Sequence, residues 1–123
     1  MHAPRWLSLP MLLAIQPGSV RDRHQAIVKS ALAAPRKLHD RDPSADLATL
    51  AAAYATSLAQ THGFMPGSRR AAFLAAYVFL GLNGCDIEAT ELAVADIIER
   101  LANRKMGERE VADWLRGACI SLE

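Results

Sequence analysis

The chain has 123 residues, a mass of 13.3 kDa and a formal charge of +1. This length provides one hydrophobic core, so we expect a single domain over residues 1–123. A charge balance without a basic excess argues against nucleic acid as a partner, and 51% apolar with 22% charged residues argues against disorder. Alanine, the strongest helix former, dominates the apolar residues while aromatic residues reach only 6%, and this composition favours an all-α fold.

The first part of the chain predicts two helices separated by a turn. Residues 6–15 are apolar and form the least defined of the expected helices. A turn at residues 17–18 precedes Asp22, which we expect to cap a helix that Pro35 ends. The polar segment 36–41 is expected to be a loop.

The middle of the chain contains two apolar helices. The first is expected to begin near Pro43 and to end near Thr61, with large side chains three and four residues apart at Leu47, Leu50, Tyr54 and Leu58. The second is expected to run from Ser68 to Asn83. Gly84 follows it in the position of a left-handed cap.

Two further helices complete the expected fold. Thr90 can cap the first of them, and the second is expected to start near Gly107, with Val111, Trp114 and Leu115 on one face. Alternation of apolar and polar residues is not convincing anywhere, so no strand is expected. The prediction is an all-α bundle of about five to six helices.

The cysteine and histidine residues give no sign of a metal site. Cys85 and Cys119 lie far apart without a neighbouring cysteine or histidine pair, so reduced thiols are expected, with an intramolecular bridge as the alternative. His24 and His39 lack the spacing of a metal pair and are expected at the surface. Residues 71–82 carry no charge but are too few to cross ~30 Å of hydrocarbon, so we expect a buried helix, no membrane partner and a cytoplasmic location.

Residues that carry chemistry are concentrated between the two apolar helices, in the segment 62–70, HGFMPGSRR. Arg69 and Arg70 stand in the first turn of a helix, where the helix dipole makes a cation cost about 0.3–1 kcal/mol, so we expect an anion to offset them. Free N–H groups at the helix start, a close approach at Gly67, the Ser68 hydroxyl and two guanidinium groups together suit a phosphate.

His62 opens the same segment and can act as a general base near neutral pH. A loop of this composition, with exposed arginines and a solvated or capping histidine, is also common where no ligand binds. The residues alone leave both interpretations open.

The segment resembles the signature of the Fic/Doc superfamily, His-x-Phe-x-Asp/Glu-Gly-Asn-Lys/Gly-Arg, which lies between two helices. Further segments in the same order resemble the death-on-curing (Doc) toxin branch: residues 30–35, 50–55, 79–84 and 111–116. The resemblance covers about residues 20–117. It implies a Fic/Doc-type helical bundle whose motif loop embraces the phosphates of a nucleotide.

The same resemblance implies a bacterial toxin that uses ATP or another NTP to transfer a phosphoryl or nucleotidyl group to a protein hydroxyl. In Doc the target is elongation factor Tu, and a Phd-like antitoxin neutralises the toxin. Carried over by position, His62 and Arg70 are the catalytic residues, with His62 as the base for the target hydroxyl. Gly67, Ser68, Arg69 and Arg70 are the nucleotide-binding residues.

Two positions depart from the family pattern. Pro66 replaces the acidic residue that holds Mg²⁺, and Ser68 replaces the asparagine. Proline cannot ligate a hard cation, and the sequence contains no Asp or Glu between Leu47 and Cys85. No metal ligand is therefore assigned, Mg²⁺ is in doubt, and we expect catalysis to be weak or lost.

Three functions are open on this basis. The first is a Doc-type toxin with residual transferase activity, and the second is a catalytically inactive helical module that binds a nucleotide or a partner. The third is a helical interaction protein in which the motif binds nothing. A substitute cation ligand is needed only by the first function, whereas the arginines are needed by the first and second.

Overall fold

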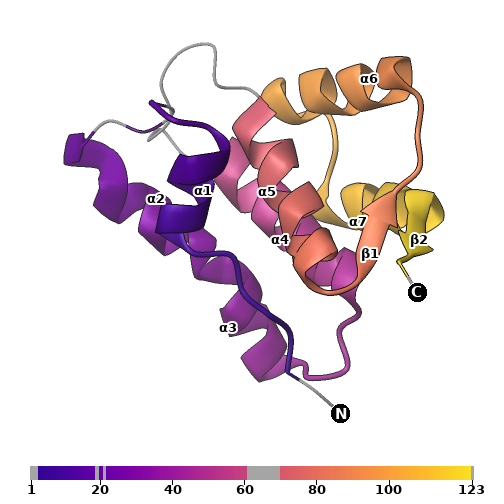
Figure 1. The fold of residues 1–123 in the computed structure, drawn as a ribbon, viewed down its shortest axis with the longest axis horizontal. Coiled ribbons are helices and arrows are strands. Elements are labelled where there is room, and N and C mark those ends of the chain that lie inside the picture. Colours follow the sequence, from indigo (N-terminus) through magenta and orange to yellow (C-terminus); the bar gives the residue numbers. More distant parts are fainter. Residues whose placement is uncertain (1–2, 19, 21, 61–69, 123) are drawn as a thin grey trace.

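The computed structural model describes residues 3–18, 20, 22–60 and 70–122 (Figure 1). The described residues confirm the all-α architecture, with one small sheet added. The helices are α1 (Leu9–Ile15), a 3-10 turn η1 (Asp22–His24), α2 (Gln25–Leu32), α3 (Ala34–Arg41), α4 (Leu47–Ala59), α5 (Arg70–Leu82), α6 (Glu91–Ala102) and α7 (Glu108–Ala118), and the strands are β1 (Cys85–Ile87) and β2 (Cys119–Ser121). None of these helices is long and apolar enough to cross a membrane.

The core is built on α4, which lies behind α5 in Figure 1 and makes its most extensive contacts with α5 and α7. Every α4 residue from 50 to 56 is buried, and the expected spacing is confirmed because Leu50, Tyr54 and Leu58 are completely enclosed. Phe79 of α5 packs on the Tyr54 ring, with ring centroids 4.9 Å apart. Alanines between these large side chains keep the helices close together, and burial of the apolar surface stabilises the pair.

Two polar contacts show that α7 runs antiparallel along α4. Near the end of α7, Arg116 Nε lies 2.8 Å from Oδ2 of Asp46, the residue that caps the start of α4. At the start of α7, Glu108 Oε1 accepts a 2.9 Å hydrogen bond from Thr56 Oγ1, near the end of α4. Val111 and Leu115 are buried between these two contacts, as the apolar stripe predicts.

An extended N-terminal segment, residues 3–8, is fastened across α4 and α5. We call its polar contacts the N-terminal clasp. The Leu7 N–H donates to the Tyr54 hydroxyl at 2.9 Å, and the Asn83 side chain bonds both the N–H and the carbonyl oxygen of Arg5, at 2.8 and 2.9 Å. Trp6 then stacks on Phe79 with a centroid separation of 5.9 Å. The segment thereby covers the side of the core that α7 leaves open.

The expected loop at residues 36–41 is wrong, because this segment belongs to α3. Pro35 does not simply end the preceding helix; it stands in the first turn of α3, where its missing N–H is not needed, and it is buried. His39 on α3 is also not a plain surface residue. It is half-buried, with its ring edge-on to Trp6 at 5.6 Å.

The small sheet is a second correction, because no strand was expected. Strands β1 and β2 pair antiparallel, with Cys85 opposite Ser121 and Ile87 opposite Cys119. Each strand has only three residues, too few for an alternating pattern, and the two pair across a long separation in sequence.

The expected helix caps are mostly confirmed. Thr90 Oγ1 accepts from the Ala93 N–H at 3.1 Å, Gly107 precedes α7, and Gly84 has the positive φ of 87° that a left-handed cap requires. Asp22 is wrong as a helix cap, because it begins the 3-10 turn and α2 starts three residues later without a side-chain cap.

Candidate functional site

The motif lies between the end of α4 and the start of α5, the two helices that form the centre of the core. α4 ends at Ala59 with Gln60 as its cap, and α5 begins at Arg70. Of the predicted site residues, the structure places Arg70 alone. His62, Gly67, Ser68 and Arg69 lie outside the described residues, and so does Pro66.

Arg70 is exposed and is the first residue of α5. The first turn of α5 contains no acidic residue, although acids are the residues that normally complement this end of a helix. The guanidinium charge and the positive end of the helix dipole therefore add together at one point of the surface. An anion bound there gains from both charges.

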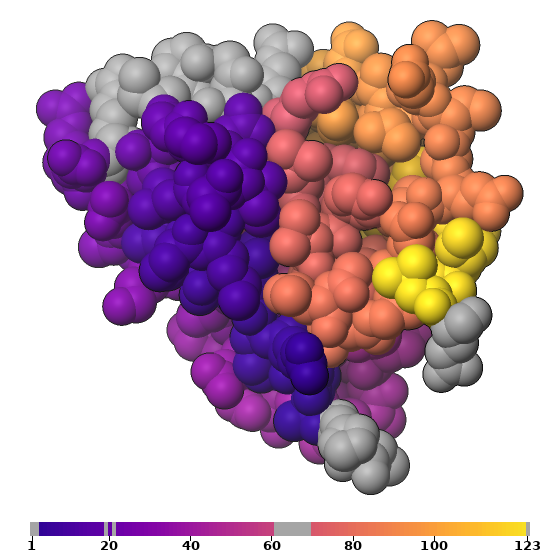
Figure 2. All heavy atoms as spheres, viewed as in Figure 1, coloured from indigo at the N-terminus to yellow at the C-terminus, as the bar shows by residue number. Residues whose placement is uncertain are grey.

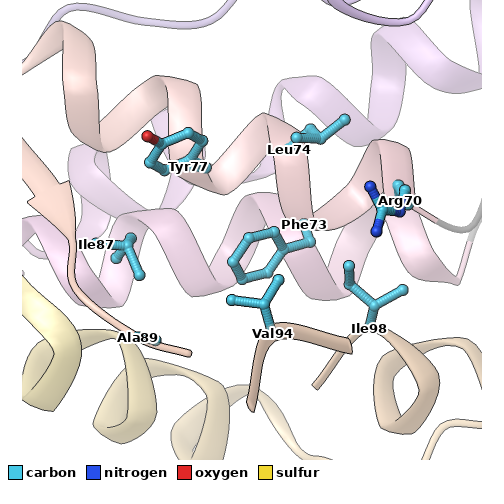
Figure 3. A pocket seen from close by; sticks show the side chains of 8 residues that line it. All are labelled: Arg70, Phe73, Leu74, Tyr77, Ile87, Ala89, Val94 and Ile98. Carbon is cyan, nitrogen blue, oxygen red and sulfur yellow. The ribbon is translucent and has the colours of Figure 1, made fainter. Parts of the chain in front are cut away.

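An apolar cavity of about 260 Å³ opens beside Arg70, between α5, α6 and the small sheet (Figure 3). Arg70 is at one end of the cavity and Tyr77 is at the other, with Phe73 between them. Seven residues besides Arg70 line it: Phe73, Leu74, Tyr77, Ile87, Ala89, Val94 and Ile98. The site therefore combines one cation with an apolar pocket large enough for a small planar group.

The outer face of α5 borders this cavity and lies open between the N-terminal segment and the sheet (Figure 2). Tyr77 on this face is 39% exposed. A hydrogen bond with Asp86 of β1, aided by the negative charge of that carboxylate, raises the pKa of Tyr77. The Tyr77 hydroxyl therefore stays protonated at neutral pH and is bound to the Asp86 side chain.

The described residues do not fit a Mg²⁺ ion beside Arg70. They contain no group of three or more His, Cys, Asp or Glu side chains that could hold a metal ion. Glu108 of α7 is an acid that contacts α4, and its carboxylate accepts a hydrogen bond from the Thr56 hydroxyl.

The cavity residues were missed by the sequence analysis. Phe73 and Tyr77 read as ordinary members of an apolar helix, and Ile87 and Ile98 come from elements that meet α5 only in the folded chain. The one usable signal was the absence of charge over residues 71–82, because a helix with an exposed face seldom lacks polar residues.

The fold and the position of the site define a helical protein whose motif connects two central core helices. A model of the Fic/DOC family matches residues 7–80, which is more than half of the chain and includes both α4 and the start of α5. The chain belongs to the Fic/DOC family, whose members are protein-modifying transferases and toxins. No curated protein matches the chain.

Proposed function

We propose that this chain is a Doc-like toxin component of a bacterial toxin–antitoxin module that binds ATP or another NTP and has weak or lost transferase activity. The observation that carries the proposal is the position of Arg70, which stands at the positive end of α5 and at the mouth of an apolar cavity. A nucleotide presents both matching groups, because its phosphates are anionic and its base is flat and largely apolar on its faces.

The phosphates are assigned to the motif end of α5. Arg70 contacts a terminal or bridging phosphate, and Gly67, Ser68 and Arg69 provide the remaining contacts by their positions in the family signature. The cavity lined by Phe73 and its neighbours is a candidate for the base. Guanidinium groups suit this role because they keep their charge and bind phosphate oxygens in a bidentate manner.

The transfer step is assigned to His62. As a general base it takes the proton from a target hydroxyl, whose oxygen then attacks a phosphorus atom of the nucleotide while the bond to the leaving phosphate breaks. The family reaction also requires charge neutralisation that this chain supplies poorly, because Pro66 offers no carboxylate. We therefore expect a rate far below that of family members with a complete motif.

A second candidate function is a catalytically inactive module that holds a nucleotide or a partner. The absence of any Asp or Glu between Leu47 and Cys85 favours it, because binding needs the arginines but not the acid. The partners assigned in both cases are a Phd-like antitoxin and, as target, elongation factor Tu, in the cytoplasm. These assignments rest on the resemblance to the Doc branch alone.

Calorimetry with ATP, with and without Mg²⁺, tests the proposal. We expect weak binding that changes little with Mg²⁺ and that Arg70→Ala weakens about tenfold or more, as expected when a charged hydrogen bond is lost. Arg41→Ala is the matched control, because Arg41 is an exposed arginine at the end of α3, away from the cavity. No heat of binding with the wild-type chain, or equal loss in both variants, would contradict the proposal.

A further inference from the structure

The two cysteines, which are distant in sequence, meet on one face of the small sheet. In the register of β1 and β2, Cys85 is opposite Ser121 and Cys119 is opposite Ile87. Side chains at alternate positions of a strand share a face, so all four side chains point to the same side. Cys85 and Cys119 are therefore diagonal neighbours across the pair of strands.

The two thiols are free. Both belong to half-buried cysteines without a disulfide, and both residues pack against the core. Small oxidants can reach a half-buried thiol, and the strand register holds the two cysteines side by side on one face of the sheet.

We propose that Cys85 and Cys119 form a redox site, in which a low-molecular-weight disulfide oxidises the thiol pair to a reversible intramolecular disulfide between β1 and β2. The proposal is independent of nucleotide binding and of the transferase reaction. Its consequence is a covalent tie between the strand that follows α5 and the strand that follows α7.

The order of the two steps follows from the surroundings of Cys119. Burial, together with the hydrogen bond to Cys85, raises the pKa of Cys119 to about 11, so this thiol is protonated at neutral pH. We assign the first attack to Cys85, whose thiolate bonds to one sulfur of the oxidant RSSR and releases RS⁻. Cys119 then loses its proton, attacks the Cys85 sulfur and releases the second RS⁻. One S–S bond forms, one breaks, and the two protons end on two molecules of RSH.

The diagonal position explains why this bond should be reversible. Diagonal Cα atoms in an antiparallel pair are about 7–8 Å apart, slightly beyond the span of about 4.4–6.8 Å that disulfides usually have. Forming the bond therefore requires a small shift of two short strands. Such a bond is more easily reduced than one between directly opposed positions, where Cα atoms of a non-hydrogen-bonded pair are about 4.5 Å apart.

The test incubates the full chain in glutathione buffers of increasing oxidised fraction, blocks free thiols with N-ethylmaleimide, and maps the products by mass spectrometry without reductant. We expect a monomer that has lost two hydrogen atoms, takes up no maleimide, and yields one peptide pair joined through Cys85 and Cys119. Its Tm should rise by about 5 °C or more and return after dithiothreitol is added. Glutathione bound separately to each thiol, a dimer linked through one cysteine, or both thiols alkylated in every buffer would overturn the proposal.

Variants separate the specific bond from general oxidation. Cys85→Ser and Cys119→Ser should each abolish the rise in Tm on oxidation. If a variant folds poorly, the peptide map of the wild-type chain still tests the bond between the two cysteines. Cys119→Ser combined with Ser121→Cys moves the second thiol directly opposite Cys85. The disulfide of this variant should be reduced only at a higher proportion of reduced glutathione than the disulfide of the wild-type chain. Reduction at the same or a lower proportion would contradict the diagonal geometry.

Discussion

Arg116 on α7 donates hydrogen bonds to both carboxylate oxygens of Asp46, with Nε 2.8 Å from Oδ2 and Nη2 3.2 Å from Oδ1. The same carboxylate caps α4 by accepting from the Thr49 N–H at 2.9 Å. One side chain thus joins the start of α4 to the end of α7, in the fork geometry that guanidinium and carboxylate groups favour. The hydrogen bond from Arg116 is the main reason that the pKa of Asp46 lies well below its usual range.

This pairing predicts a loss of stability in acid. Because the pKa of Asp46 is lower in the folded than in the unfolded chain, its contribution is present at neutral pH and fades as pH falls below about 4, the usual pKa of aspartate. Half of the Asp46 side chain is exposed, so we expect a difference of only a few degrees in Tm. Thermal melts of the wild-type chain and of Asp46→Asn at several pH values measure it.

The two melting curves should converge at low pH, because both side chains are then neutral. Asp113→Asn is the control, since it removes only the other partner of Arg116, a more exposed carboxylate within α7. A gap between the wild-type chain and Asp46→Asn that stays constant from neutral to acidic pH would mean that the charge of Asp46 does not contribute.

Tyr54→Phe should destabilise the chain by about 1–3 kcal/mol. The substitution keeps the ring contact with Phe79 but leaves the buried Leu7 N–H without its 2.9 Å acceptor. Urea unfolding measures the change in free energy, and hydrogen exchange should show faster exchange at the Leu7 amide. Tyr77→Phe is the matched control, because Tyr77 is 39% exposed and its hydroxyl bonds the Asp86 side chain rather than a buried backbone N–H; equal losses in both variants would count against the N-terminal clasp.

Arg104→Gly should stabilise the chain by about 0.5–1 kcal/mol. Arg104 follows α6 with a φ of 55°, which costs a residue with a Cβ atom energy that glycine avoids. The turn it forms closes α6 through hydrogen bonds from Arg104 N to Leu101 O and from Lys105 N to Arg100 O. Urea unfolding checks the sign, and Arg100→Gly, inside the helix, should instead cost about 1 kcal/mol.

Restoring the family motif should raise transferase activity. Pro66→Asp with Ser68→Asn supplies the acid and the amide that the signature contains, so Mg²⁺-dependent labelling of elongation factor Tu from radiolabelled ATP should increase by at least an order of magnitude over the wild-type chain. Adding His62→Ala to the restored chain should abolish the gain. If the restored chain is folded and its labelling does not increase, the loss of the acid does not explain weak catalysis.

The central helices could be predicted from the sequence because their signals are local. The apolar spacing from Leu50 to Leu58 predicted the helix α4, and Gly84 marked the end of α5 because glycine adopts a positive φ more easily than other residues do. α3 was missed because Pro35 indicates a helix start and a helix end equally well. Leu92 of α6 is apolar and yet 83% exposed, since a single apolar residue does not show which face of a helix is buried.

Only the part of the site that is contiguous in the sequence could be predicted. Residues 62–70 stand together in the sequence, so their chemistry was visible, and the family match over residues 7–80 agrees with the family to which they point. The cavity beside Arg70 was not visible, because Ile87 and Ile98 approach α5 through the turn at Gly84 and the packing of α6. The diagonal placement of Cys85 and Cys119 depends in the same way on a strand register that no local pattern specifies.

The N-terminal clasp has a practical consequence for producing the protein. A purification tag placed ahead of residue 3 would lie close to Arg5. The N–H and the carbonyl oxygen of Arg5 are both hydrogen-bonded to the side chain of Asn83, which is 78 residues away in sequence. A bulky or charged fusion there would pull on Trp6 and, through its stacking, on Phe79 in the middle of the core. Tags are better attached after Leu122, where the side chain already faces solvent.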